Sequence, residues 1–372
     1  MKILADAHIP YLKGVAEQFG EVEYLPGNQF TQKAIKNKDA LIVRTVTHFG
    51  EDILSGTNVK LICSATIGYD HIDTEYCDTH GIAWKTAPGC NANSVEQYIT
   101  SSLLMLSEKH NFNLKDKTIG IVGVGNVGSK VDIACRILGM KVLLNDPLRE
   151  AIEKNNNHIK FTDIETIQRE ADFITFHTPL TKSGKYSTFH LANIEFLNNC
   201  LRKPFIINAA RGGVTSNRAL KSALKEGLIS GVVLDCWENE PVIDLELLRM
   251  ADIATPHIAG YSADGKWTAT KMSIENLKNF FNLPTIPVYR KIPLPLQPII
   301  DLKNIPEEKQ LFHAVRHTYS STEETKELKK SPQNFYQFRS KYPLRREYKA
   351  HFVENASEAV LVILKRLGFT EK

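Results

Sequence analysis

The sequence predicts an α/β protein with two doubly wound parallel sheets and a small C-terminal α+β domain. Short apolar runs alternate with polar segments in two series, a glycine-rich turn opens the second series, and prolines set off the last part of the chain. Such alternation is typical of parallel strands joined by crossover helices. The length of 372 residues favours two or three domains.

The first series occupies the first hundred residues. Residues 2–5, 40–43 and 60–63 are predicted to be buried strands, and the segments between them are long enough for crossover helices. Residues 94–109 carry apolar side chains mostly three and four positions apart, which predicts a helix. This helix is expected to lead from one domain into the next.

The second series begins at Thr118. Its predicted strands have the sequences TIGIVGVG, KVLLND, DFITFH, PFIINAA, GVVLDCW and DIATPH. The pattern stops near Leu283-Pro284, and the prolines that follow indicate a linker. The chain ends in the helical pattern NASEAVLVILKRLG, in which Gly368 is a natural stop.

Composition excludes several classes of protein. With 42% hydrophobic and 24% charged residues, the chain is typical of soluble globular proteins, and no stretch is long and apolar enough to span a bilayer. The start, MKILADAHIP, is interrupted by Asp6 and predicts a strand rather than a signal peptide. The six cysteines show no CxxC spacing, so we expect neither a disulfide framework nor a metal site, and a cytoplasmic location.

Charge is distributed unevenly along the chain. From Ile286 to the end there are 16 Lys and Arg against 10 Asp and Glu, whereas the rest of the chain has 30 against 32. A basic tail can bind nucleic acid or a small anion. Interspersed acids such as Glu323, Glu324 and Glu327 favour a solvated surface of mixed charge, so we expect no nucleic-acid partner.

The glycine-rich turn predicts a dinucleotide site. Gly123, Gly125 and Gly128 follow a strand and open a helix, with Asn126 and Val127 between them, and Asp146 ends the next strand 18 residues beyond Gly128. These positions match a Rossmann-type turn, where the glycines admit a pyrophosphate and the acid binds the adenosine ribose. A carboxylate repels a 2′-phosphate and so favours NAD over NADP, although the nearby Arg149 weakens that preference.

Arg211, Glu240 and His257 are the candidate catalytic residues. Each follows the carboxyl end of a predicted strand, where doubly wound sheets bind their ligands. Histidine can take the hydroxyl proton while hydride leaves the same carbon, and a carboxylate can orient its ring. Arginine can hold a substrate carboxylate. Together they indicate a dehydrogenase of a small 2-hydroxy acid.

Each of these residue types has a simpler explanation when taken alone. A lone arginine after a strand is more often a surface charge, and a lone histidine more often a structural residue. We assign structural roles to His71, His177 and His190.

The motifs IVGVGNVG, LNDP, HTPLTKSG, INAARGG, LDCWENEP and HIAGYS together resemble the D-isomer-specific 2-hydroxyacid dehydrogenases over roughly residues 40–265. The resemblance implies that Arg211, Glu240 and His257 are catalytic. It implies NAD contacts by Asp146, Thr178, Ala209, Ala210, Arg211, Asp235 and Gly260, with Asp235 near the nicotinamide amide. It implies substrate contacts by Thr45, Thr66 and Tyr261.

One branch of that family has similar forms of MKILAD, ALIVRTVT, SATIGYDHID, APGCNANSVEQY and HIAGYSADGK, and of FRSKYPLRREY and KRLGF in the C-terminal part. The resemblance to this branch implies a homodimer that acts on a phosphorylated four-carbon 2-hydroxy acid. A phosphate requires a cationic site besides Arg211. The candidates are Arg44, at the end of a strand, and the pair Arg345 and Arg346 in the basic tail, for which a solvated surface role is an equal alternative.

The resemblance also implies a domain plan. Residues 1–95 and 259–285 would form the substrate-binding domain, 96–258 the NAD-binding domain and 286–372 a dimerisation domain. Two alternatives remain open: a dehydrogenase of 3-phosphoglycerate or another D-2-hydroxy acid, and an NAD-sensing transcriptional corepressor built on the same fold.

Overall fold

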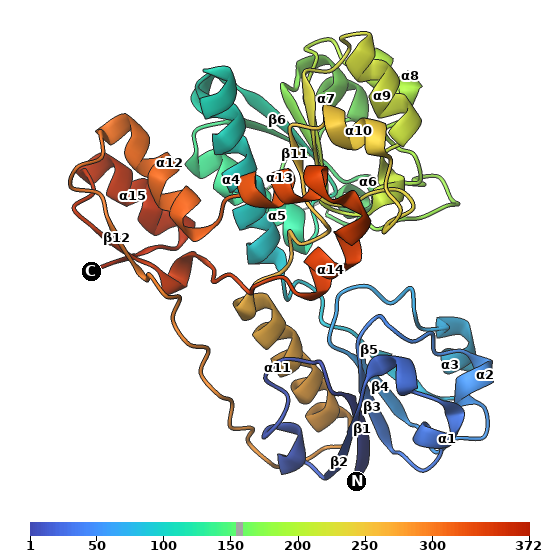
Figure 1. Ribbon diagram of the computed structural model, residues 1–372. Coiled ribbons are helices and arrows are strands. Elements are labelled where there is room, and N and C mark those ends of the chain that lie inside the picture. The colour runs from blue at the N-terminus through green and yellow to red at the C-terminus, as the bar shows by residue number, and fades with distance from the viewer. Residues whose placement is uncertain (154–158) are drawn as a thin grey trace. The chain divides into compact units, whose positions relative to one another are not determined.

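A computed structural model describes residues 1–153 and 159–372, and the chain divides into two compact units (Figure 1). The first comprises Met1–Asn91 and Ser262–Pro293, and the second comprises Ala92–Tyr261 and Leu294–Lys372. The C-terminal segment, expected to be a separate domain, is thus part of the same compact unit as the central residues. Among the described helices, none is both long and apolar enough to cross a membrane.

The first unit contains a parallel sheet in the order β2-β1-β3-β4-β5. The strands are β1 (Lys2–Asp6), β2 (Glu21–Leu25), β3 (Ala40–Val43), β4 (Leu61–Ser64) and β5 (Ala83–Lys85). Its helices are α1 (Gln32–Ile35), α2 (Glu51–Leu54), α3 (Thr74–Thr79) and α11 (Ala263–Phe280). The long α11 buries Ile274 and Leu277 in one of the two apolar clusters of this unit.

The structure corrects two features predicted for this unit. The crossover helices are short, since α1 and α2 have four residues each and α3 has six. The edge strands β2 and β5 were not predicted. Both leave most of their residues partly or fully exposed, so neither contributes the continuous apolar run by which the central strands are recognised.

The second unit contains a six-stranded parallel sheet in the order β11-β10-β9-β8-β6-β7, which confirms the second predicted series. The strands are β6 (Thr118–Val122), β7 (Lys141–Asn145), β8 (Phe173–Phe176), β9 (Phe205–Asn208), β10 (Gly231–Leu234) and β11 (Ile253–Ala254). The helices that connect or flank them are α4 (Ala92–His110), α5 (Asn126–Ile137), α6 (Pro147–Ile152), α7 (Ile164–Glu170), α8 (Ile194–Asn198), α9 (Asn217–Lys225) and α10 (Leu245–Met250).

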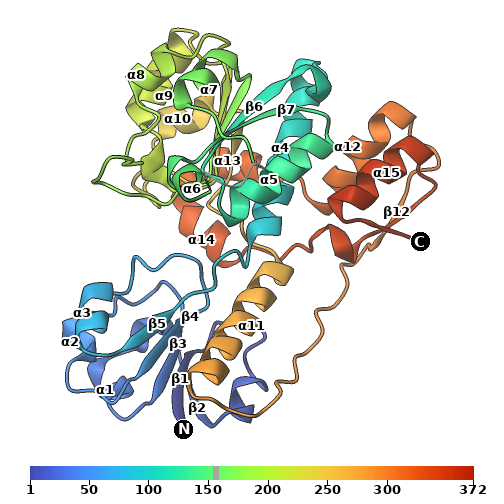
Figure 2. The same ribbon diagram turned by 180° about the vertical axis from the view of Figure 1, so that it is seen from behind.

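Strands β6, β8, β9 and β10 are buried along their whole length because helices cover both faces of the sheet. Successive residues of a strand therefore enter different cores: Ile207 and Val233 pack on the side of α4 and α5, whereas Ile206 and Val232 pack on the side of α7 to α10 (Figures 1 and 2).

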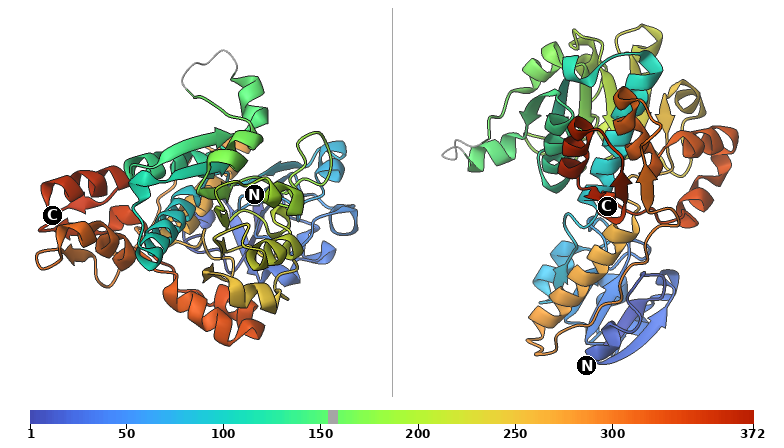
Figure 3. Two further views of the ribbon diagram at one scale, coloured as in Figure 1. Left: turned by 90° about the horizontal axis from the view of Figure 1, so that it is seen from above. Right: turned by 90° about the vertical axis from the view of Figure 1, so that its left-hand side faces the viewer.

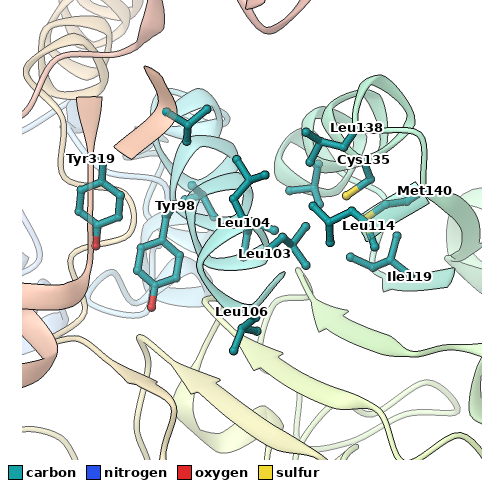
Figure 4. Packing of buried hydrophobic residues seen from close by; sticks show 14 of the residues in the cluster. Tyr98, Leu103, Leu104, Leu106, Leu114, Ile119, Cys135, Leu138, Met140 and Tyr319 are labelled. Atoms are coloured by element: carbon teal, nitrogen blue, oxygen red, sulfur yellow. The ribbon is translucent and has the colours of Figure 1, made fainter. Parts of the chain in front are cut away.

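Helix α4, predicted over residues 94–109, forms the centre of the first of these cores. Figure 4 shows Tyr98, Leu103 and Leu106 of α4 among the side chains of the cluster, with Cys135 of α5 and Leu138, the residue just after α5, also in it. Burying a large apolar side chain contributes roughly 1.5–3 kcal/mol. This helix is thus fixed firmly against the sheet that carries the candidate site.

The C-terminal segment extends the same core. It contains a small parallel sheet in the order β12-β13-β14, formed by β12 (Ile299–Asp301), β13 (Phe352–Glu354) and β14 (Thr370–Glu371). Its helices are α12 (Glu307–Thr318), α13 (Thr322–Lys330), α14 (Phe335–Ser340) and α15 (Glu358–Leu367). Helix α12 packs on α4 and α15 packs on α5, so the orange and red helices lie beside the teal ones (Figure 3). Residues 282–298 contain no helix or strand, in agreement with the predicted linker.

Candidate functional site

The three candidate catalytic residues follow three neighbouring strands of the six-stranded sheet. Arg211 follows β9, Glu240 follows β10 and His257 follows β11, and the parallel pairing of these strands places their carboxyl ends at one edge. The carboxyl edge of an open parallel sheet is where such folds bind ligands. The structure therefore places the three residues on adjacent loops.

Glu240 and His257 form a direct pair. The Oε1 atom of Glu240 lies 2.5 Å from Nδ1 of His257, and its Oε2 atom accepts a hydrogen bond of 3.2 Å from the backbone N–H of Trp237. Burial by itself raises the pKa of Glu240, but the hydrogen bond and charge of His257 outweigh it and leave that pKa below its usual value. The carboxylate is thus ionised at neutral pH. No hydrogen bond of His257 Nε2 is found within the described residues, so this nitrogen is available for proton transfer.

Asp235 holds the backbone that carries His257. Its carboxylate, 1% exposed, accepts hydrogen bonds from the backbone N–H groups of Ile258 at 2.7 Å and Ala259 at 2.9 Å. Thr255 donates a further hydrogen bond of 2.6 Å. His257 has a φ of 57°, in the left-handed region that non-glycine residues enter only when the surroundings hold them there. Asp235 therefore fixes the loop; its expected contact with the cofactor remains a prediction.

The loop that carries Arg211 is held by a buried side chain that the sequence analysis did not single out. Asn208, at the end of β9, accepts from the Ala210 N–H at 3.1 Å and donates to the Arg211 carbonyl at 3.0 Å. Gly212 lies so close to Trp237 that an added Cβ would be 2.0 Å from its carbonyl oxygen. The Arg211 loop and the Glu240 loop can approach each other only with glycine at position 212.

The glycine-rich turn has the geometry of a dinucleotide site. Gly128 is buried, and a Cβ there would lie 2.0 Å from the carbonyl oxygen of Gly123, so α5 can begin close to β6 only with glycine. Gly125 and Asn126 are exposed at the start of α5, where backbone N–H groups and the helix dipole favour a pyrophosphate. Val127 is partly buried between them and Gly128.

Two side chains beside this turn also fit a dinucleotide. The Thr178 Oγ1 atom, after β8, is buried and has no hydrogen-bond partner among the described residues. Asp146, after β7, accepts from the N–H groups of Val124 at 2.9 Å and Arg149 at 3.0 Å. Strands β7, β6 and β8 are neighbours, so both residues flank the turn at the point where the strand order reverses.

The predicted substrate residues of the first unit lie at the ends of two neighbouring strands. Arg44 and Thr45 follow β3, and Thr66 follows β4. The Arg44 guanidinium is held by both oxygens of the buried Asp6, at 2.9 and 3.2 Å. The Thr66 hydroxyl lies 2.7 Å from that of Ser64, and Thr45 is exposed.

Arg345 is tied to the loop after β11. Its guanidinium donates to the carbonyl oxygens of Ile258 at 3.1 Å, Ala259 at 2.5 Å and Tyr261 at 3.2 Å. It also donates to Ser94 O and Gln97 Oε1 of α4, at 3.0 and 2.9 Å. These contacts favour a structural role and do not support the predicted phosphate contact. Arg346 is partly buried beside it, and its carbonyl accepts from Gln97.

The surroundings of two histidines, His177 and His190, support the structural roles assigned to them. Burial lowers the pKa of His177 to about 3, so it is neutral at physiological pH. The Nε2 atom of His190 lies 2.5 Å from Oε1 of Glu238, and Oε2 of Glu238 accepts a hydrogen bond from the Asn217 N–H at the start of α9. This second histidine–carboxylate pair braces α9.

Comparisons with known proteins agree with the geometry. Residues 93–259 match the model of the D-isomer specific 2-hydroxyacid dehydrogenase, NAD binding domain. Erythronate-4-phosphate dehydrogenase of Bacteroides thetaiotaomicron is 49% identical, covering 94% of this chain and 98% of that protein. The enzyme of the same name from Porphyromonas gingivalis is 41% identical, covering 99% of this chain and 100% of that protein.

Solved structures show the same fold. D-lactate dehydrogenase of Aquifex aeolicus, complexed with NAD and lactic acid, is 26% identical with a TM-score of 0.60, over 76% of this chain and 96% of that one. NAD⁺-bound 3-phosphoglycerate dehydrogenase of Entamoeba histolytica is 25% identical with a TM-score of 0.63, over 77% of this chain and 96% of that one.

The chain therefore belongs to the D-isomer-specific 2-hydroxyacid dehydrogenases and is an NAD-dependent oxidoreductase. Within that class, it belongs to the family of the erythronate-4-phosphate dehydrogenases.

Proposed function

We propose that this enzyme oxidises 4-phospho-D-erythronate to (R)-3-hydroxy-2-oxo-4-phosphooxybutanoate, in the biosynthesis of pyridoxine 5′-phosphate. The observation that carries the chemistry is the Glu240–His257 pair, which leaves one ring nitrogen available on the loop after β11. The names of relatives that match the chain over nearly its whole length support the substrate.

The proposed mechanism assigns one task to each residue. His257 Nε2 accepts the proton of the C2 hydroxyl, and Glu240 holds the ring in the required tautomer and stabilises the imidazolium. Arg211 binds the substrate carboxylate through paired hydrogen bonds. NAD, which the glycine-rich turn and Asp146 would hold, would supply the acceptor for the hydride of C2. As the proton and the hydride leave, the C2–O bond becomes a carbonyl.

We propose binding roles for the remaining predicted residues. The backbone of Gly123, Gly125, Asn126, Val127 and Gly128 would hold the pyrophosphate of NAD, and Asp146 the ribose. Thr178, Ala209, Ala210, Asp235 and Gly260 would complete the NAD contacts. Thr45, Thr66 and Tyr261 would contact the substrate, and Arg44, aligned by Asp6, would add positive charge.

A panel assay tests the substrate. Purified enzyme with NAD is given 4-phosphoerythronate, 3-phosphoglycerate, glycerate and lactate, and NADH formation is followed by absorbance. We expect the highest kcat/KM with 4-phosphoerythronate. A higher value with 3-phosphoglycerate would instead assign the enzyme to that substrate, and binding of NAD without turnover of any acid would favour the corepressor alternative.

We further propose a cytoplasmic homodimer. The family resemblance supports dimerisation, and the exposed apolar side chains of Leu294, Leu296 and Ile299 at the start of the C-terminal segment are compatible with it. Sedimentation should give a mass of about twice the 41.9 kDa of one chain. A monomeric mass at micromolar concentration contradicts the proposal.

A further inference from the structure

Arg339 of α14 is a cation beside the loop that carries His257. Its Nε atom donates a hydrogen bond of 3.0 Å to the hydroxyl of Tyr261, and its guanidinium carbon lies 5.7 Å from the centroid of that ring. Tyr261 is four residues beyond His257. The charge of Arg339 also helps to lower the pKa of Glu240, after the larger effects of burial, which opposes it, and of His257. Arg339 thus belongs to the surroundings of the Glu240–His257 pair.

The hydrogen bonding of Arg339 differs from that of Arg345. Arg345 donates to carbonyl and amide oxygens from all three of its nitrogen atoms. For Arg339, the hydrogen bond from Nε to Tyr261 is the only one found within the parts of the chain that the structure describes. Both Nη groups of Arg339 can therefore donate to a ligand. A guanidinium with two such groups is suited to the oxygens of a phosphate.

The protein positions Arg339 before any ligand binds. At the start of α14, Phe335 is 2% exposed and packs in the core that also contains Leu328 of α13. Beyond the helix, the ring of Tyr342 meets that of Tyr261 edge-on, with centroids 6.2 Å apart. Both ends of the segment are anchored, so little conformational entropy is lost when Arg339 binds an anion.

The charges of the site match the two anionic ends of the proposed substrate. Arg211 and Arg339 both lie near the loop after β10, which carries Cys236 and Glu240. Burial raises the pKa of the Cys236 thiol well above its usual range, and the positive charges of both arginines oppose that rise. Arg211 is assigned to the carboxylate. A phosphate at the other end of the acid needs a second cation, and Arg339 provides one in the same unit of the fold.

We propose that Arg339, from the C-terminal segment of the same chain, binds the phosphate of the substrate. The proposal rests on the function proposed above and names the residue that distinguishes phosphorylated from unphosphorylated acids. It assigns to Arg339 the role that the sequence suggested for Arg345 and Arg346. If Arg339 only supports Tyr261, its loss should affect both kinds of acid equally.

Kinetics with two matched substrates test the proposal. For Arg339→Met, we expect kcat/KM for 4-phosphoerythronate to fall about 30- to 100-fold, mainly through KM, because a charge-assisted hydrogen bond is lost. The kcat/KM for erythronate, which has no phosphate, should fall at least about tenfold less than this, because only the effect of Arg339 on Tyr261 and Glu240 is lost. Arg339→Lys should recover part of the loss. Equal losses with both acids, or no loss with either, would overturn the proposal.

A binding measurement separates this proposal from the proposed function. Inorganic phosphate is titrated calorimetrically into the NAD-bound enzyme, and we expect binding to wild type and at least tenfold weaker binding to Arg339→Met. Lys341→Met, at an exposed position just after α14, is the matched control and should bind like wild type. If wild type fails to oxidise 4-phosphoerythronate, the proposed function fails, and the titration still decides the anion site. If phosphate binds equally to wild type and to Arg339→Met, or does not bind to wild type, the proposal that Arg339 binds the substrate phosphate is overturned.

Discussion

At the residue scale, a few polar contacts each hold one part of the candidate site in position. Glu240 orients His257, Asp235 holds the backbone on which His257 sits, and Asn208 holds the peptide before Arg211. The positions of Arg211, Glu240 and His257 after neighbouring strands could be predicted because each follows a recognisable apolar strand, and their catalytic roles stay a prediction. Asn208 could not, because an asparagine at the end of a strand has no distinctive pattern. Only the structure shows the hydrogen bonds of its side chain to the Ala210 N–H, the Arg211 carbonyl and the Thr215 hydroxyl.

Replacing the proposed base tests the assignment directly. For His257→Ala, we expect kcat to fall by at least about 100-fold, the usual contribution of a general base, while NAD still binds. Stopped-flow absorbance measures hydride transfer, and calorimetry measures NAD affinity. His190→Ala is the matched control because His190 is also paired with a glutamate but braces α9. Near-normal turnover by His257→Ala would mean that another group takes the proton.

At the element scale, helix α4 carries a buried carboxyl that the sequence analysis did not identify. Glu96 is 8% exposed and accepts a hydrogen bond of 2.8 Å from Thr100. Burial, with a smaller contribution from the nearby Glu347, raises the pKa of Glu96 to about 8. The helix was predictable from the spacing of its apolar residues. The burial of its polar positions was not, because α12 and the segment around Glu347 cover them only in the folded chain.

The sign of the resulting pH dependence follows from linkage. Between the ordinary pKa of 4.5 and the folded value of about 8, the folded state binds a proton that the unfolded state lacks, so the stability contribution of Glu96 falls as pH rises. Glu96 can change the free energy of unfolding by at most about 1.4 kcal/mol per pH unit. We expect Glu96→Gln to remove this slope and to stabilise the protein above pH 8, measured by urea unfolding across that range. Glu108→Gln, at an exposed position of the same helix, should leave the slope unchanged. If Glu96→Gln keeps the wild-type slope, Glu96 is ionised in the folded protein.

At the scale of the whole molecule, the C-terminal segment is joined to the dinucleotide-binding part by a common core. Leu302, Val315 and Phe369 lie in the same apolar cluster as Tyr98 and Ile119. The ring of Tyr319 lies beside that of Tyr98. The guanidinium carbon of Arg345 lies over the Tyr319 ring, 4.2 Å from its centroid. The segment therefore stabilises the loop with His257, although the sequence suggested a separate domain.

Arg345→Met tests this coupling. Several buried oxygens would lose their donor, so we expect the free energy of unfolding to fall by about 2–4 kcal/mol, with a loss of kcat as the loop after His257 relaxes. Chemical denaturation and steady-state kinetics measure the two effects, with Lys341→Met as the exposed control. A rise in KM for the phosphorylated substrate with unchanged stability would restore Arg345 to the phosphate role that the sequence suggested.

The sequence by itself determined the order of the central strands along the chain, the glycine-rich turn and the residues at the strand ends. It could do so because apolar periodicity and glycine geometry are local properties. Tertiary structure alone decided which arginine of the basic tail donates to Tyr261. In the sequence, nothing distinguishes Arg339 from Arg345 and Arg346. In the structure, α14 packs against the core and brings Arg339 to Tyr261, whereas Arg345 donates its hydrogen bonds to backbone carbonyls.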